Sequence, residues 1–192
     1  MWGVIPLQHP DGRLSIADRH GRALASVHIP QGDTNDCGPH VITMAVNFWH
    51  GHDTLDAHTT AQAMNRPRWG VGIPPLVVRR IPNWATFPWG ITDMLRQHDV
   101  PARWRLWASE DDLLRALRED RLVMPIYGQP LRRNGWRFTG WSHVVILAGW
   151  TPATSTFQFI DSSQHTAPTS IPRDRFLKQW GNMGRLLIEI RD

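Results

Sequence analysis

The stretch Gln31-Gly32-Asp33-Thr34-Asn35-Asp36-Cys37-Gly38-Pro39-His40-Val41-Ile42-Thr43-Met44 contains the only cysteine of the chain. Turn-forming residues precede Cys37, and apolar residues at helical spacing follow it as far as Trp49. Pro39 suits the first turn of a helix, where a missing N–H is tolerated, and Gly51 marks the end. The pattern therefore predicts a buried helix that begins next to Cys37.

The position of Cys37 favours a thiolate nucleophile over a packing residue. A free cysteine has a pKa near ~8.5 and is mostly protonated at neutral pH, so a nucleophilic thiol needs a positive environment. A helix N-terminus supplies unpaired N–H groups and the positive end of the helix dipole. Gly38 keeps the approach to the sulfur free of a side chain. We therefore expect Cys37 to be a nucleophile and Gly38 to lie beside the bound substrate.

A thiol nucleophile needs a base, and His143 is the best placed of the ten histidines. It is expected to be the first residue of an apolar strand over 143–150. Asp161 is expected to end the following antiparallel strand, where its carboxylate would orient the His143 ring. Gln31 lies six residues before the cysteine, and its amide together with the Cys37 N–H would form an oxyanion hole.

The other histidines are expected to have structural roles. His40 shares the predicted helix with Cys37 and is not expected to face the sulfur. Three histidines form a spaced cluster that lacks a cysteine or a suitable carboxylate pair to complete a metal site, namely His50, His52 and His58. The remainder lie in segments expected to be peripheral or turn-like: His9, His20, His28, His98 and His165. No metal and no cofactor is expected.

Composition indicates one globular domain. The chain has 192 residues, of which 41% are hydrophobic and 20% charged, and its net charge is +4. Acidic and basic residues are interspersed without a dense basic block, so the expected partner is a peptide or protein substrate and not nucleic acid. No apolar run is long enough to span a membrane. The first residues lack signal-peptide features, so a reduced, cytoplasmic setting is expected. The sequence leaves the oligomeric state open.

The order of the expected elements indicates an α+β fold, with helices in the first half and antiparallel strands in the second. Residues 1–30 are expected to form an N-terminal extension containing a hairpin, with strands over 14–17 and 24–29 and a turn at 20–22. Residues 31–192 are expected to form the main domain. Helices are expected over 39–50, 53–65, 91–98, 109–120 and 172–180, and strands over 100–107, 122–127, 143–150, 157–161 and 185–190. Long loops are expected over 66–90 and 128–142.

The stretch 31–44 resembles the active-site entry of the double-glycine-leader peptidases, the bacteriocin-processing cysteine peptidases of the papain-like clan. Trp141-Ser142-His143-Val144-Val145-Ile146-Leu147 resembles the strand that carries their histidine, and Phe159-Ile160-Asp161 resembles the strand that ends in their third catalytic residue. The similarity in layout extends from Gln31 to Ile190. The resemblance implies a papain-like fold, in which an N-terminal helical part with the nucleophile helix packs on a C-terminal antiparallel sheet. It also implies cleavage after Gly-Gly or other small residues.

The chain departs from this family pattern in three ways. Ser162 follows Asp161, where family members often carry proline. Many members are parts of ATP-driven exporters, and this chain has no Gly-Lys-Ser phosphate loop. Residues 1–30 and the segment 66–90, rich in proline and tryptophan, lie outside the resemblance. The catalytic class is unaffected, but leader-peptide specificity is left open.

The sequence thus predicts a stand-alone papain-like cysteine peptidase that acts through four residues: Cys37, His143, Asp161 and Gln31. Trp136 and Trp141, in the loop before the histidine, are expected to form walls of the cleft. Two alternatives remain open. A transglutaminase-like acyl transferase would use the same triad with an amine in place of water, and a catalytically inactive module would only bind peptides.

Overall fold

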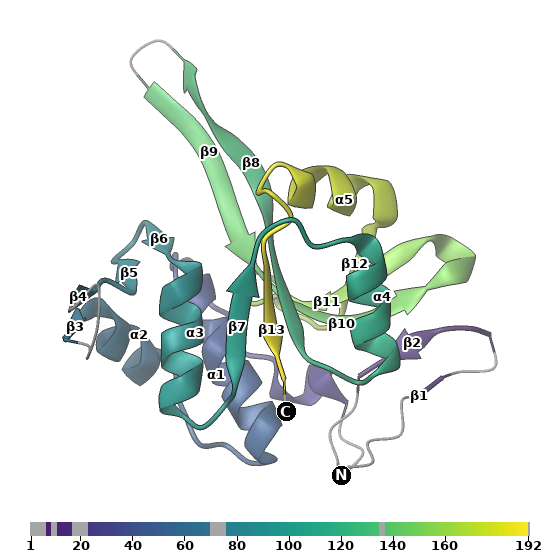
Figure 1. Cartoon of the computed structure of the whole chain (residues 1–192), viewed down its shortest axis with the longest axis horizontal. Coiled ribbons are helices and arrows are strands. Elements are labelled where there is room, and N and C mark those ends of the chain that lie inside the picture. The colour runs from purple at the N-terminus through teal and green to yellow at the C-terminus, as the bar shows by residue number, and fades with distance from the viewer. Residues whose placement is uncertain (1–6, 9–10, 17–22, 70–75, 135–136, 192) are drawn as a thin grey trace.

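A computed structural model describes residues 7–8, 11–16, 23–69, 76–134 and 137–191 (Figure 1). The helices are α1 (Cys37–His50), α2 (Ala57–Asn65), α3 (Pro88–Gln97), α4 (Glu110–Arg118) and α5 (Arg173–Gly181), with short 3₁₀ helices η1 (Leu24–Val27) and η2 (Pro152–Thr154). The strands are β1 (Leu7–Gln8), β2 (Leu14–Ser15), β3 (Arg68–Trp69), β4 (Leu76–Val77), β5 (Arg80–Ile81), β6 (Ala85–Thr86), β7 (Ala102–Arg105), β8 (Val123–Asn134), β9 (Arg137–Val144), β10 (Ile146–Thr151), β11 (Thr156–Ile160), β12 (Thr169–Pro172) and β13 (Leu187–Ile190).

The larger strands form two antiparallel sheets. One has the order β1-β2-β10-β11-β12 and the other the order β7-β13-β8-β9, while β3-β4 and β5-β6 form small separate pairs. Helix α1 packs against α2, α3 and β9, and α5 packs against β8, β11 and β12. Helices α1 to α3 therefore gather beside the four-stranded sheet, as Figure 1 shows. The predicted α+β fold, with the nucleophile helix packed on an antiparallel sheet, is confirmed.

Helix α1 is the centre of the core. Every residue from Val41 to Phe48 is buried, so this helix is covered on all sides and removes apolar surface from water all round. The helix ends where Gly51 adopts a left-handed conformation with φ of 76°, which a residue without a Cβ adopts at little cost. The predicted end of this helix is confirmed, and the helix starts slightly earlier than the expected residue 39, at Cys37 itself. Within the described residues, no helix is both long and apolar enough to cross a bilayer.

The second helix begins later than predicted. It starts at Ala57 and not at 53, and the Asp56 carboxylate caps it. The reason is the buried side chain of Asn47, whose Oδ1 accepts hydrogen bonds from the backbone N–H groups of Thr54 (2.8 Å) and Leu55 (2.9 Å). These bonds hold the preceding segment as a loop and leave Asp56 as the first residue able to cap.

The expected N-terminal hairpin is wrong in its second strand. Residues 24–27 form the 3₁₀ helix η1, in which Leu24 and Val27 are buried one turn apart. Strand β2 pairs instead with β1 and with β10, where Ser15 lies opposite Gly149. The expected turn at 20–22 lies outside the described residues. The division of the chain at residue 30 remains a prediction.

Both expected long loops contain strands. Strands β8 and β9 continue through much of 128–142 as a long hairpin that projects from the body of the molecule (Figure 1). His143 therefore lies at the end of β9 and not at the start of β10, because the strand breaks at Val145, whose N–H donates to the Pro125 carbonyl. In the described part of 66–90, the four short strands β3 to β6 lead into α3, which begins at Pro88.

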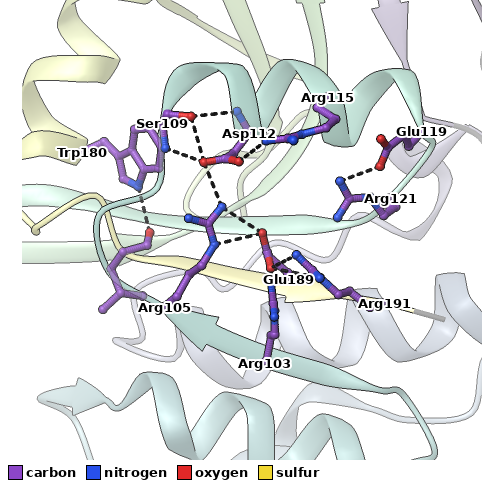
Figure 2. Close-up of polar contacts among 11 residues, drawn as sticks. Arg103, Arg105, Ser109, Asp112, Arg115, Glu119, Arg121, Trp180, Glu189 and Arg191 are labelled. Carbon is purple, nitrogen blue, oxygen red and sulfur yellow. Dashed lines mark hydrogen bonds and ion pairs between the residues drawn. The ribbon is translucent and has the colours of Figure 1, made fainter.

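A buried carboxylate on β13 pairs with several arginines beside the four-stranded sheet (Figure 2). Glu189 on β13 is 2% exposed and pairs with Arg103 (2.8 Å), Arg105 (3.1 Å) and Arg191 (2.9 Å). Burial alone would raise the pKa of Glu189, but hydrogen bonds from the arginines outweigh burial and lower it. Arg105 also pairs with Asp112 on α4 (2.9 Å), so the network ties β7, β13 and α4 together.

Candidate active site

Cys37 is the first residue of α1, and its sulfur lies among hydrogen-bond donors. The sulfur interacts with the His143 side chain and with the backbone N–H groups of Gly38 and Val144. Burial alone would raise the pKa of the Cys37 thiol, but the bond to His143, its charge and the backbone donors outweigh burial and lower that pKa. The local environment therefore favours a thiolate.

The His143 ring bridges the thiol and a carboxylate. Its Nε2 lies 2.6 Å from Oδ1 of Asp161, which leaves Nδ1 for the Cys37 sulfur. Burial alone would lower the pKa of His143, but the hydrogen bonds to Asp161 and Cys37 and their charges outweigh burial and raise that pKa to about 9. A lowered thiol pKa and a raised imidazole pKa both shift the equilibrium toward a thiolate–imidazolium pair.

Asp161 follows β11 directly and is 3% exposed. Besides His143, its Oδ1 accepts hydrogen bonds from Ser163 N–H (2.8 Å) and Ser163 Oγ (2.7 Å). The Tyr127 hydroxyl donates to Oδ2 at 3.5 Å, and Tyr127 lies opposite His143 in the β8–β9 register. Burial alone would raise the pKa of Asp161, but His143 and Ser163 lower it. The carboxylate is thus fixed in position as an anion.

Gln31 is half-buried and bonded to the residue after Asp161. Its backbone N–H donates to the Ser162 carbonyl (2.7 Å), and its Oε1 accepts from the Ser162 hydroxyl (2.7 Å). Its Nε2 donates to the Thr34 carbonyl at 2.7 Å. Hydrogen bonds therefore hold both the oxygen and the nitrogen of the Gln31 side-chain amide. The role of this amide as an oxyanion donor remains a prediction.

A small pocket of about 20 Å³ opens beside the thiol. A space of this size holds about one water molecule. The pocket is lined by the β5–β6 hairpin and by the base of the β8–β9 hairpin, where the two strands leave the body of the molecule. The lining residues are Asn35, Cys37, Trp84, Ala85, Thr86, Ile126, Ser142, His143 and Val144. Trp84 is 66% exposed, so it lies at the mouth of the pocket.

The β5–β6 hairpin is bonded to the loop that carries Cys37. The buried Arg80 guanidinium pairs with Asp36, the residue before the cysteine, at 2.5 Å. On the same loop, the Asn35 side chain donates to the Asn83 carbonyl at 3.1 Å. The segment 66–90, which the resemblance left unexplained, therefore supplies one wall of the pocket. Its only signal in the sequence was its content of proline and tryptophan.

The β5–β6 hairpin leaves no space for a side chain at position 38, which is a second reason for glycine there besides access to the sulfur. A Cβ at Gly38 would lie 2.5 Å from Cγ2 and Oγ1 of Thr86, which is far inside van der Waals contact. Trp141, expected as a cleft wall, is 42% exposed and packs edge-on against Tyr127 with ring centres 5.5 Å apart, outside the set that lines the pocket. Trp136 lies outside the described residues.

The remaining histidines have other partners, and one is closer to the site than expected. His28 was expected to be peripheral, yet its Nε2 lies 3.0 Å from the backbone oxygen of Asp161. The His40 ring contacts the Asp36 carbonyl at 2.8 Å, away from the sulfur as predicted. The rings of His50, His52 and His58 contact separate partners. Over the described ranges, no group of three or more His, Cys, Asp or Glu side chains is arranged so that it could hold a metal ion.

The fold is similar to two solved cysteine peptidases. A putative C39-like peptidase from Bacillus anthracis matches with a TM-score of 0.66 at 15% identity, covering 95% of this chain and 98% of that one. A double-glycine-motif protease from an AMS/PCAT transporter, solved in complex with the leader peptide, matches with a TM-score of 0.52 at 12% identity, covering 85% and 91%. No protein-family model matches the sequence. No curated protein matches it either.

Proposed function

We propose that this chain is a cysteine peptidase in which Cys37 attacks the carbonyl carbon of a peptide bond. The observation that carries the proposal is that Cys37, His143 and Asp161 come together at a helix N-terminus beside a pocket, with His143 hydrogen-bonded to Asp161 and lowering the pKa of the Cys37 thiol. The fold it shares with two cysteine peptidases supports the same reaction. A setting that keeps the thiol reduced, such as the cytoplasm, belongs to the proposal.

The reaction proceeds in two balanced steps. The Cys37 thiolate forms a bond to the carbonyl carbon, and the oxyanion accepts hydrogen bonds from the Cys37 N–H and from Gln31. The His143 imidazolium then donates its proton to the leaving amine as the C–N bond breaks. In the second step, neutral His143 removes a proton from water, which attacks the thioester. The acid product leaves, and the thiolate–imidazolium pair is restored. Asp161 keeps the ring oriented throughout.

The size of the pocket supports a preference for small residues at the cleaved bond. The space of about 20 Å³ beside the sulfur is narrow, and a small side chain fits it more easily than a large one. The double-glycine-motif protease, which shares the fold, was solved with a leader peptide. Cleavage after Gly-Gly or another small residue is therefore the specificity that we propose.

A peptide library tests this function and the choice of acceptor. We expect the wild-type chain to cleave peptides after glycine or alanine and Cys37→Ala to cleave none, with the products identified by mass spectrometry. A second reaction with added amine separates hydrolysis from acyl transfer. Hydrolysis releases the acyl part of the peptide as a carboxylic acid, whereas acyl transfer joins it to the added amine as an amide. Cleavage that persists in Cys37→Ala would overturn the proposal. Binding without any reaction in the wild type would favour the peptide-binding module.

A further inference from the structure

Ser162 connects two parts of the proposed machinery. It follows Asp161 directly and is fully buried. Its carbonyl accepts the backbone N–H of Gln31 at 2.7 Å, and its hydroxyl contacts Oε1 of the same residue at 2.7 Å. One residue therefore positions both the backbone and the side chain of Gln31 relative to the end of β11.

The partners of the Gln31 amide determine which way it points. The Thr34 carbonyl can only accept a hydrogen bond, so the atom 2.7 Å from it must be the amide nitrogen. Oε1 then faces Ser162, and the Ser162 hydroxyl must donate. A primary amide nitrogen carries two N–H groups, and Thr34 uses one of them. Across the described residues, no hydrogen-bond acceptor is found for the second.

We propose that Ser162 is a positioning residue that holds the Gln31 amide so that its second N–H is directed to the oxyanion. The proposal rests on the proposed function. Without the hydroxyl, Oε1 of Gln31 would lose its donor in a partly buried site, and the amide would turn to find another. Proline, which the family resemblance would place at this position, has no hydroxyl to give. The hydroxyl is therefore a feature of this chain and not of the resemblance.

A double-mutant cycle on Gln31 and Ser162 tests the proposal. Removal of an oxyanion donor costs about 10²- to 10³-fold in kcat, so Gln31→Ala should lose about that much. We expect Ser162→Ala to lose about 10-fold or more in kcat with little change in KM, and to cause no further loss in the Gln31→Ala background. The iodoacetamide rate at Cys37 and the pH profile should stay at wild-type values, because alkylation forms no oxyanion.

Independent losses from the two variants, an unchanged kcat in Ser162→Ala, or slowed alkylation would overturn the proposal. If Ser162→Ala does not fold, the pair Ser162→Thr and Ser162→Val replaces it, because these side chains have nearly the same volume and differ in the hydroxyl. Thr should then keep more kcat than Val, and equal values would overturn the proposal. Failure of the proposed function looks different, since cleavage would persist in Cys37→Ala whatever residue stands at 162.

Discussion

The Nε2 atom of His143 lies 2.6 Å from Oδ1 of Asp161, although 18 residues separate them in the chain. The antiparallel pairing of β10 and β11, which places Ile146 opposite Ile160, brings the start of one strand beside the end of the other. Ser163 donates two further hydrogen bonds to the same Oδ1. Ser163 thus holds the Asp161 carboxylate in place, and the carboxylate in turn orients the His143 imidazole.

Asp161→Asn should lower kcat/KM for peptide cleavage by about 10²- to 10⁴-fold, the range for loss of correctly oriented acid–base catalysis. The alkaline limb of the pH profile should also move to lower pH, because Asp161 helps to raise the pKa of His143. Asp174→Asn is the matched control, since the Asp174 side chain is 92% exposed on α5 and should leave cleavage unchanged. Equal kinetics for Asp161→Asn and wild type would contradict the assigned role.

The dependence of kcat/KM on pH should be bell-shaped. Activity should rise as Cys37 loses its proton, at a pH below the usual thiol pKa of 9.0, because that pKa is lowered. Activity should fall as His143 loses its proton near pH 9, because its pKa is raised to about 9. Initial rates of cleavage of one peptide, measured from about pH 4 to about pH 10, define both limbs of the profile. An acid limb at the usual thiol pKa would show that the ion pair does not form.

Gly38→Ala should destabilise the fold by about 1–3 kcal/mol, the usual cost of overpacking. The new Cβ would lie 2.5 Å from side-chain atoms of Thr86, and Thr86→Gly removes the atoms that obstruct it. The double variant should therefore recover part of the stability and activity that Gly38→Ala loses. Urea unfolding and peptide cleavage, measured on the wild type, the two single variants and the double variant, give the changes in stability and in activity. Purely additive losses would show that the β5–β6 hairpin does not limit the residue at 38.

Trp84→Ala should raise KM for peptide substrates about 10-fold and change kcat little, because an aromatic side chain at the mouth contributes contact area and not chemistry. Trp107→Ala is the matched control, since Trp107 is 78% exposed and lies outside the pocket lining. Steady-state kinetics on one peptide compare the two variants. The same KM in both would mean that the β5–β6 hairpin takes no part in substrate binding.

Local patterns were sufficient to predict α1 and α4 from the sequence. Apolar spacing with Gly51 at the end gave the extent of α1, and the capping box of Ser109 and Asp112 starts α4 as predicted. The start of α2 was missed because it depends on Asn47, a side chain from another helix. The long β8–β9 hairpin was missed because pairing with a partner strand, and not the composition of 128–142, makes those residues extended.

The proximity of Cys37, His143 and Asp161 was predicted from the helix that follows Cys37 and from the apolar strands on either side of the 151–156 turn, although His143 ends β9, which was expected to be a loop. Trp84 and Thr86 were not found, because their place in the pocket depends on how the hairpin folds back onto the Cys37 loop. The bond between Gln31 and Ser162 joins residues 131 positions apart. No local pattern signals such a contact.

The rate at which iodoacetamide alkylates Cys37 at pH 6 tests the central claim, that His143 holds the thiol as a thiolate. Intact-mass spectrometry follows a single adduct, because Cys37 is the only cysteine. An ordinary thiol is less than about 1% ionised at this pH. We therefore expect the wild type to react about 10- to 100-fold faster than His143→Ala and than the urea-unfolded chain. Equal rates in all three would contradict the account.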